Sequence, residues 1–285
     1  MQEGIIIKAV GGFYFVDTPA GEYRCYLRGR VKREIAPLVG DRVKIRPVDG
    51  ESAVIEEVLP RQNSLIRPPI ANVDQCIVVA AMADPSLNLK QLDRFLVLIQ
   101  AASLEAIICF NKVDLVPAVE VAAVADIYRQ AGFVVVLTSV KTGVGIETLA
   151  ELLEGKISVL AGPSGAGKSS LLNKIQPGFS LQVGEVSRKL GRGRHTTRHV
   201  ELLPLPGKGR VADTPGFTSL YLTGLERREL MYYFPEFIDL APHCRFSPCL
   251  HWQEPECAVK EGVKQGKIDK GRYKHYLDFL KELEG

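Results

Sequence analysis

The chain has 285 residues, of which 46% are hydrophobic and 24% are charged, and its formal net charge is only +3. This length accommodates an α/β core of about 150–200 residues beside one or two small modules. With so small a net charge, composition alone gives no indication of nucleic-acid binding. No run approaches the ~18 apolar residues of a membrane span. The start, MQEG, lacks the basic and apolar stretches of a secretory signal, so we expect a cytoplasmic protein.

Residues 1–65 are expected to form a small all-β barrel. Strand character recurs at 4–16, 22–31, 41–45 and 53–58, with glycine, proline and aspartate between these stretches. About five short strands in this length favour a barrel over a sandwich, and the OB-fold, which often binds RNA, is the natural candidate. A barrel without any ligand is the alternative. Cationic and apolar side chains alternate on what would be a basic outer face, at Arg24, Tyr26, Arg28, Arg30 and Lys32.

Positive charge is concentrated in two runs of the chain. Residues 24–46 hold eight lysines and arginines against two acidic residues, and residues 186–200 hold five against none. One such run is as well explained by a solvated face. Two runs in separate regions favour a polyanionic partner.

A proline-containing linker, residues 60–72, follows the barrel, and we place a domain boundary near residue 65. Pro68 and Pro69 forbid a helix there and disfavour a central strand. Residues 66–220 then alternate buried strands with helices, which predicts an open, doubly wound α/β sheet. The strands are expected at 76–81, 106–110, 133–137 and 157–161, and the helices at 89–102, 117–131 and 146–153.

A phosphate-binding loop follows the last of those strands. The pattern G-x-x-x-x-G-K-S lies between a strand and a helical stretch, which is the context that a P-loop requires. Its glycines let backbone N–H groups turn towards phosphates, and the helix N-terminus adds its positive end. Lys168 is expected to reach the β- and γ-phosphates and Ser169 to ligate Mg²⁺. The loop's nucleotide-binding residues are expected to be Gly162, Pro163, Ser164, Gly165, Ala166, Gly167, Lys168, Ser169 and Ser170.

The motif NKVD, residues 111–114, indicates that the base is guanine. The Asp114 carboxylate can accept hydrogen bonds from both N1–H and the 2-amino group of guanine. Adenine would leave that carboxylate facing a lone pair, at a cost of ~1–3 kcal/mol or more. Asn111, followed by Lys112, can bond the N7 side of the purine and tie its loop to the P-loop. Ser139 and Lys141 belong to the loop expected to contact guanine O6 by backbone N–H.

Two further segments complete the expected site. Asp213 is expected to hold Mg²⁺ through a water molecule, and the Gly216 N–H to meet the γ-phosphate. The next residue is Phe217, where a Ras-like GTPase has the glutamine that orients the attacking water. His195 is the candidate for that task, against the alternative of an ordinary surface histidine. Thr197 is expected to close the Mg²⁺ shell, so catalysis would rest on His195, Lys168 and Thr197.

The order of these motifs is reversed relative to most GTPases, in which the P-loop strand comes before the guanine motif. We therefore expect a circularly permuted domain, whose chain is cut after the second switch. Motion of that switch would then pass directly into residues 221–285. There we expect a short helix over 225–233 and a final helix that turns one face inwards, with Tyr273, Tyr276, Leu277 and Leu280.

Four residues of the C-terminal region form a candidate metal site: Cys244, Cys249, His251 and Cys257. Three thiols and one imidazole match a closed tetrahedral Zn²⁺ site, so we expect one structural zinc ion. A disulfide framework would leave an odd thiol and conflicts with a reducing compartment. Because the region has few large apolar residues, the metal would supply much of its folding free energy. The other cysteines, Cys25, Cys76 and Cys109, lie singly in apolar runs and are expected to be buried.

Together these motifs resemble the RsgA (YjeQ/YloQ) family of circularly permuted GTPases. The likeness covers essentially the whole chain, through the barrel, IRPPIANVDQ, NKVD, GPSGAGKSSLLN, GRGRHTTR, DTPGF and the cysteine–histidine cluster. It implies an OB-fold, a permuted GTPase domain and a C-terminal zinc domain. It also implies binding to the small ribosomal subunit through its rRNA, subunit-stimulated hydrolysis of GTP, and a role in late subunit maturation. In that family a hydrophobic residue stands at the position of Phe217, and a histidine at the position of His195 is the proposed substitute.

Two other functions stay open on the residues alone. One is a GTP-gated RNA-binding module whose hydrolysis is incidental. The other is a zinc protein with a degenerate nucleotide pocket, against which the intact Lys168, Ser169 and Asp213 argue. A monomer is the default expectation in each case.

Overall fold

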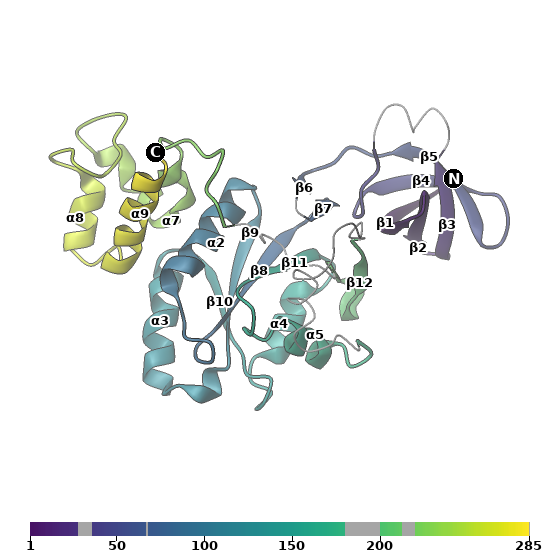
Figure 1. Cartoon of the computed structure of the whole chain (residues 1–285), viewed down its shortest axis with the longest axis horizontal. Helices are drawn as coiled ribbons and strands as arrows, with labels where there is room; N and C mark the ends of the chain where they lie inside the picture. The colour runs from purple at the N-terminus through teal and green to yellow at the C-terminus, as the bar shows by residue number, and fades with distance from the viewer. Residues whose placement is uncertain (28–35, 67, 180–199, 213–219, 285) are drawn as a thin grey trace, which may run out of the picture. The chain divides into compact units, whose positions relative to one another are not determined.

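The computed structural model describes residues 1–27, 36–66, 68–179, 200–212 and 220–284 of the chain. These residues divide into two units. The first takes Met1–Cys76, Ala150–Leu160 and Lys168–Thr218, and the second takes Ile77–Leu149, Ala161–Gly167 and Ser219–Gly285. Figure 1 colours the elements in chain order, from the purple strands at the N-terminus to the yellow helix at the C-terminus.

Five strands close into a barrel in the first unit, as the sequence predicts. The strand order is β1-β2-β3-β5-β4, and β1 pairs with β4 to close it. The β3–β5 pair is parallel and the other four pairs are antiparallel, an OB-like arrangement. Cys25 and the side chains around it fill the interior with no exposed surface. The strands are β1 (Gln2–Val10), β2 (Phe13–Thr18), β3 (Gly21–Leu27), β4 (Arg42–Pro47) and β5 (Ser52–Val58).

The outer face of the barrel carries less free positive charge than the sequence alone indicates. Arg24 is exposed and lies over the Phe13 ring, 3.8 Å from its centroid. On β4, however, Lys44 and Arg46 pair with glutamates of β5 at 2.8 and 2.9 Å. Such exposed pairs stabilise a protein by at most ~1 kcal/mol, but they neutralise charge. Arg42 of β4 is exposed. The other basic residues of the two runs lie outside the described residues: Arg28, Arg30, Lys32, Arg33, Arg188, Lys189, Arg192, Arg194 and Arg198.

The expected linker is tied to the barrel by hydrogen bonds. The Asn72 side chain donates to the Gly40 carbonyl, just before β4, at 3.0 Å. Arg61 donates to the buried carboxylate of Asp41 at 2.7 Å. This segment is therefore an ordered connection. It contains two short antiparallel strands, β6 (Ser64–Ile66) and β7 (Pro69–Ala71).

A six-stranded sheet follows, in the order β10-β9-β8-β11-β13-β12. The pairs β10–β9 and β11–β13 are parallel, and β12 runs antiparallel to β13. Every residue of β8 and β11 is buried, which is why those segments are apolar without alternation. The strands are β8 (Gln75–Ala81), β9 (Glu105–Asn111), β10 (Val134–Leu137), β11 (Ile157–Ala161), β12 (Leu202–Pro204) and β13 (Arg210–Ala212).

The helices of this region agree closely with the predicted ones. Helix α2 (Leu89–Ala101) begins after Asn88, whose side chain accepts from the Gln91 N–H at 2.9 Å and so caps the helix. The others are α3 (Ala118–Gln130), α4 (Ile146–Leu153), α5 (Lys168–Ile175) and the short 3₁₀ helices η1 (Val113–Leu115) and η2 (Pro206–Lys208).

The prediction of a helix over 225–233 is wrong for most of its length. Only its last turn is helical, as the 3₁₀ helix η3 (Leu230–Tyr233), and the residues before it form turns. The backbone bonds there span three residues, as from Glu229 N–H to the Glu226 carbonyl at 3.0 Å. Leu222, which precedes these turns, and Leu230, which follows them, both lie in the buried core of the C-terminal region.

The C-terminal helix α9 (Lys270–Glu282) buries the face that the sequence predicts and two further residues. Tyr276 and Leu280 are fully buried, while Tyr273 and Leu277 are partly buried. Phe279 joins them, and so does Arg272, a residue that hydrophobic periodicity does not select. Three further elements complete this region: α7 (Pro235–Ile238), η4 (Ala241–His243) and α8 (Ala258–Lys264).

A buried ion network links α9 to α2 within the second unit. The Arg272 guanidinium donates to Asp93 of α2 and, at 3.0 Å, to Glu236 of α7. His275 Nδ1 lies 2.6 Å from the other Asp93 oxygen. The Arg272, Asp93 and Glu236 side chains are 3%, 0% and 4% exposed, so each charge depends on the others for solvation.

Candidate nucleotide site and metal centre

The P-loop runs from the end of β11 into α5, and its glycines have local causes. Gly162 has a φ of +122°, and a Cβ on it would lie 2.0 Å from the Val79 carbonyl oxygen of β8. Gly167 has a φ of +99°, and its Cβ would lie 2.3 Å from Asn111 Nδ2. Only glycine avoids both clashes while adopting positive φ. The motif glycines therefore let the loop approach β8 and the Asn111 side chain closely.

Lys168 and Ser169 are the first residues of α5 and are both buried, at 7% and 6% exposure. Burial lowers the pKa of Lys168 to about 8. An ammonium group held in such surroundings gains more from an anionic ligand than one in water. The adjoining N–H groups at the start of the helix offer further donors to an anion.

The guanine motif lies against the P-loop. Asn111 ends β9 and is 1% exposed, and its Nδ2 donates to the Ala166 carbonyl at 2.9 Å. The Ser139 hydroxyl donates to Asp114 Oδ1 at 2.6 Å and accepts from the Thr142 N–H at 3.1 Å. Asp114 itself is exposed, so one carboxylate oxygen is aligned by Ser139 while the group stays open to a ligand. The structure thus brings together Asn111, Asp114, Ser139, Ala166 and Gly167.

The two lysines of these loops differ in their surroundings. Lys112 has a left-handed backbone, with a φ of +60°. Its Nζ donates to the Asp84 carbonyl and lies 4.0 Å from that residue's carboxylate. Asp84 comes after β8 and was not among the predicted site residues. Lys141 is exposed.

Four predicted site residues fall outside the residues that the structure describes: His195, Thr197, Asp213 and Gly216. Phe217 lies outside them too. The structure thus describes the residues of the guanine motif and of the P-loop.

One buried residue of the site has a role that the sequence did not assign, although its motif, residues 138–141, was recognised. Thr138 is fully buried, and its hydroxyl donates to Asn111 Oδ1 at 3.1 Å. The sequence held a signal for it, because Thr138 directly precedes Ser139 at the end of β10. Periodicity alone classes it as a buried strand-end residue without a task.

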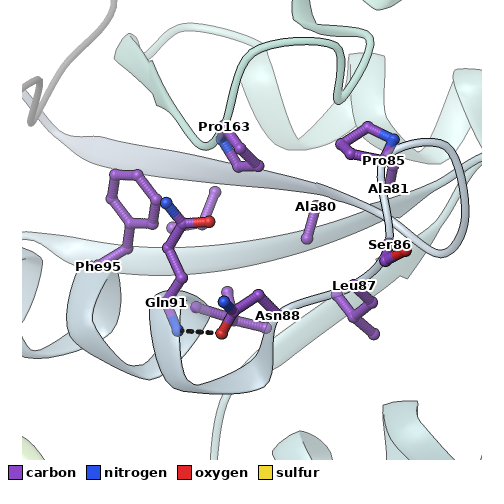
Figure 2. Close-up of a pocket in the computed structure, with 11 residues that line it drawn as sticks. Ala80, Ala81, Pro85, Ser86, Leu87, Asn88, Gln91, Phe95 and Pro163 are labelled. Atoms are coloured by element: carbon purple, nitrogen blue, oxygen red, sulfur yellow. Dashed lines mark hydrogen bonds between the residues drawn. The ribbon is translucent and has the colours of Figure 1, made fainter.

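A pocket lies beside Pro163 of the P-loop, between β8 and the start of α2 (Figure 2). Figure 2 shows the Pro163 and Pro85 rings along its upper side and the Asn88–Gln91 hydrogen bond below them. None of the lining side chains titrates near neutral pH, so we assign the pocket no chemistry. It is lined by Val78, Ala80, Ala81, Pro85, Ser86, Leu87, Asn88, Gln91, Leu92, Phe95 and Pro163.

The cysteine–histidine cluster has the geometry of a metal centre. One ligand atom from each of Cys244, Cys249, His251 and Cys257 lies within 4.8 Å of all the others. His251 Nδ1 lies 3.5 and 3.4 Å from the sulfurs of Cys244 and Cys257, which are 3.8 Å apart. A tetrahedral zinc ion separates two such sulfurs by about 3.8 Å, and a sulfur from a nitrogen by about 3.5 Å. The cluster therefore fits zinc.

The surroundings of the cluster agree with this assignment. The nitrogen of His251 that faces the sulfurs is Nδ1, which makes it the ligand atom. Burial raises the pKa of the Cys249 thiol to about 12, so a cation is needed to hold the thiolate. Hydroxyls of α9 fix the loop, since Tyr273 donates to the His251 carbonyl and Tyr276 to the Leu250 carbonyl, both at 2.7 Å. All six cysteines of the chain are free thiols.

Comparison with protein families gives two matches that together span most of the chain. Residues 58–223 match the model described as RsgA GTPase, and residues 3–55 match the RsgA N-terminal domain. In the part of the chain that the structure describes, no helix combines the length and apolar character needed to cross a membrane.

Individual relatives are similar in sequence to this chain over almost its full length. A protein of Moorella thermoacetica is 49% identical over 283 residues, which are 99% of this chain and 97% of that protein. One of Caldanaerobacter subterraneus subsp. tengcongensis is 47% identical, over 99% of this chain and 96% of its own. Both are named small ribosomal subunit biogenesis GTPase RsgA.

Two solved structures have the same fold over the whole chain. YjeQ from Thermotoga maritima superposes with a TM-score of 0.87 at 40% identity, covering 100% of this chain and 99% of its own. YloQ, described as a circularly permuted GTPase, gives a TM-score of 0.85 at 39% identity, covering 100% of this chain and 95% of its own. The permutation predicted from the motif order is therefore confirmed.

Proposed function

The chain belongs to the RsgA family of GTPases, and on that premise we propose that it binds the small ribosomal subunit and hydrolyses GTP to GDP and phosphate during late subunit maturation. The names of its curated relatives state that role for them. The observation that carries the proposal is the 2.9 Å bond from Asn111 to the Ala166 carbonyl. That bond joins the guanine motif to the P-loop, which is the arrangement that a guanine-nucleotide site requires.

The test is the rate of GTP hydrolysis with and without purified small subunits, across a range of salt concentration. We expect slow turnover by the chain alone, because Phe217 cannot position the attacking water. Added subunits should stimulate turnover, and the stimulation should fall steeply with salt, as phosphate-backbone contacts do. A chain that turns over equally fast with and without subunits would contradict the proposal.

We assign nucleotide binding to the P-loop, to the guanine-motif loops of residues 111–114 and 138–141, and to Thr197, Asp213 and Gly216. Asp114 would accept from guanine, and Lys168 would face the β- and γ-phosphates. Ser169 and Thr197 would hold Mg²⁺, which supplies positive charge to the phosphates, and the buried Ser169 hydroxyl is a suitable oxygen ligand. The remaining contacts are proposed for Asn111, Lys112, Ser139, Lys141, Gly162, Pro163, Ser164, Gly165, Ala166, Gly167, Ser170, Asp213 and Gly216.

The second candidate function is a GTP-gated RNA-binding module with incidental hydrolysis, favoured by Phe217 in place of a catalytic glutamine. The two candidates differ at His195, which would position water for hydrolysis only in the first. A His195→Ala protein that binds subunits normally but loses stimulated turnover supports the GTPase. Unchanged stimulated turnover in that variant supports the module.

Affinity for GDP is expected to fall as pH rises through the pKa of Lys168, which burial lowers to about 8. Phosphates favour the charged amine, so binding takes up a proton above that pH and weakens by up to about tenfold per pH unit. In the nucleotide-free protein the same lowered pKa makes stability rise with pH between about 8 and the ordinary lysine pKa of 10.5, because the unfolded state binds more protons there. The measurement is the Kd for GDP from pH 7 to 9, where guanine N1–H is still largely protonated, and Lys168→Met should give a flat profile there. An equally flat profile for the unsubstituted chain would contradict this assignment.

Removal of zinc is expected to unfold the C-terminal region. The metal's binding free energy is folding free energy for such sites. It adds to the packing of Cys249, Cys257 and their neighbours in the apolar core of this region. Elemental analysis should find one zinc per chain, and a strong chelator should abolish hydrogen-exchange protection in α8 and α9. Cys257→Ala should lose the metal, whereas Cys25→Ala, which removes a buried barrel thiol, should keep it. Full zinc content in Cys257→Ala would exclude the four-ligand site.

We also propose three functional parts. Residues 1–65 would be the RNA-binding barrel, residues 66–220 the permuted GTPase domain, and residues 221–285 the zinc-binding region. The closed barrel and the cysteine–histidine cluster support the outer two. A cytoplasmic monomer accords with the proposed ribosomal partner.

A further inference from the structure

A buried chain of hydrogen bonds ends at the Asn111 amide. The sulfur of Cys109 and the hydroxyl oxygen of Thr138 are 3.2 Å apart, and that hydroxyl donates to Asn111 Oδ1 at 3.1 Å. Asn111 Nδ2 in turn donates to the Ala166 carbonyl of the P-loop at 2.9 Å. Cys109 and Thr138 are 0% exposed and Asn111 is 1% exposed, so no bulk water competes for these groups.

The donor and acceptor in each of these hydrogen bonds are fixed by the last acceptor of the series, the Ala166 carbonyl. The Ala166 carbonyl can only accept, so the Asn111 nitrogen must face it and the amide oxygen must face Thr138. The Thr138 hydroxyl has one proton, and its other acceptor, the Phe110 carbonyl, is farther away at 3.4 Å. Burial raises the pKa of Cys109 to about 12, so its thiol keeps a proton that it can donate to Thr138. In this one orientation the Cys109 thiol, the Thr138 hydroxyl and the Asn111 amide oxygen all have partners.

The orientation decides what Asn111 can offer a nucleotide. Its amide nitrogen has two protons, and the Ala166 carbonyl takes one of them. The other is free to meet an acceptor such as N7 of a purine. A flipped amide would turn its oxygen towards both the Ala166 carbonyl and the lone pair of N7, and both contacts would be repulsive.

We propose that Thr138, supported by Cys109, is a positioning residue that sets the orientation of the Asn111 amide and so makes the site select a purine with an N7 acceptor. This inference rests on the proposed guanine-nucleotide site. It assigns Thr138 no contact with the nucleotide, since it acts through Asn111. Loss of its hydroxyl would leave Asn111 Oδ1 buried without its donor and remove the preference for one amide orientation.

The test compares GDP with 7-deaza-GDP, in which a C–H group replaces N7. The unsubstituted chain should bind GDP more tightly by about 5- to 150-fold, the cost of leaving a buried N–H without an acceptor. In Thr138→Val that ratio should fall towards one, while Thr138→Ser, which keeps the hydroxyl, should restore most of it. A matched control is Ser158→Ala, which removes another buried hydroxyl, one that accepts from Gln75 at 3.0 Å. It should leave the ratio unchanged.

The ratio separates positioning from loss of structure, because general damage weakens both nucleotides equally. Should Thr138→Val prove too unstable to assay, Cys109→Ala provides a second route and should lower the ratio in part. If the unsubstituted chain prefers GDP and Thr138→Val keeps the full ratio, the inference is wrong and the proposed function stands. If the unsubstituted chain prefers GDP over ADP but not over 7-deaza-GDP, Asn111 does not contact N7 and the inference also fails. Absence of GDP binding altogether would overturn the proposed function itself.

Discussion

Replacement of Arg272 by methionine is expected to lower the free energy of unfolding by about 3–5 kcal/mol, the usual cost of removing one partner from a buried ion network. Its side chain is 3% exposed and donates to two carboxylates, Asp93 and Glu236, that are equally buried. Burial lowers the pKa of Arg272, but these two carboxylates raise it by more, and the net shift is upward. The guanidinium is thus charged, and the substitution would leave Glu236 without its cationic partner and Asp93 with only the contact to His275.

Apart from His275 beside Asp93, the groups that surround the Arg272 guanidinium are largely aromatic. Its guanidinium carbon lies 5.2 Å from the ring centroids of Tyr128 and Phe234 and 5.3 Å from that of Phe133. In apolar surroundings an unpaired carboxylate takes up a proton more readily than in water. The deficit of Arg272→Met should therefore shrink as pH falls, since a carboxylate whose folded pKa is raised destabilises the protein chiefly above that pKa.

Chemical denaturation of the whole chain at several pH values measures this effect. The matched control is Arg129→Met, which removes a surface arginine paired with Asp126 at 3.0 Å, both side chains being well exposed. That change should cost less than ~1 kcal/mol. Adding Asp93→Asn to Arg272→Met should recover part of the loss. Equal stability of the two arginine variants would show that the network contributes nothing.

Substitution of Asp114 by asparagine is expected to lower GDP affinity by about 10²-fold or more and to create affinity for xanthosine diphosphate. The Ser139 hydroxyl donates to Asp114 Oδ1 at 2.6 Å, so an asparagine there would place its oxygen towards Ser139 and its amide nitrogen outwards. Donor would then face donor at the guanine 2-amino group, and two charge-assisted bonds of ~1.5–3 kcal/mol each would be lost. Xanthine carries a carbonyl at that position and can accept from the new amide.

Binding of both diphosphates to both proteins tests the reversal. Asp126→Asn, which changes an exposed carboxylate of α3, serves as the control and should bind GDP like the unsubstituted chain. Undiminished GDP affinity in Asp114→Asn would mean that this carboxylate does not contact the base. The guanine assignment would then lose its main support.

Much of the nucleotide site could be predicted because its residues act through local backbone geometry. The P-loop needs glycine at 162 and 167 wherever the motif occurs, since positive φ and close approach exclude a Cβ there. The zinc ligands could be predicted for a similar reason, because Cys244, Cys249, His251 and Cys257 all lie in one short segment of the chain. Strands such as β8 and β11 were predictable from continuous apolar runs, which reflect burial on both faces.

Contacts between distant segments depend instead on how the elements pack, and no motif encodes them. Arg272 and Asp93 are 179 residues apart in the chain, and burial of an arginine contradicts the ordinary preference of that residue for water. Turns stand in place of the predicted helix over 225–229, between Leu222 and Leu230, which both lie in the core. Glutamates of β5 neutralise Lys44 and Arg46, which the run of positive charge had suggested were free for a partner.

The guanine site shows both kinds of information in one place. The chemistry of the base contact follows from the residue types alone, because a carboxylate and an amide at this spacing pair with guanine and not with adenine. The amide's orientation does not follow, since it depends on Thr138 and Ala166, which lie in other segments and meet Asn111 only when the strands are side by side. Residue type specifies which hydrogen bonds are possible, and packing selects which of them form.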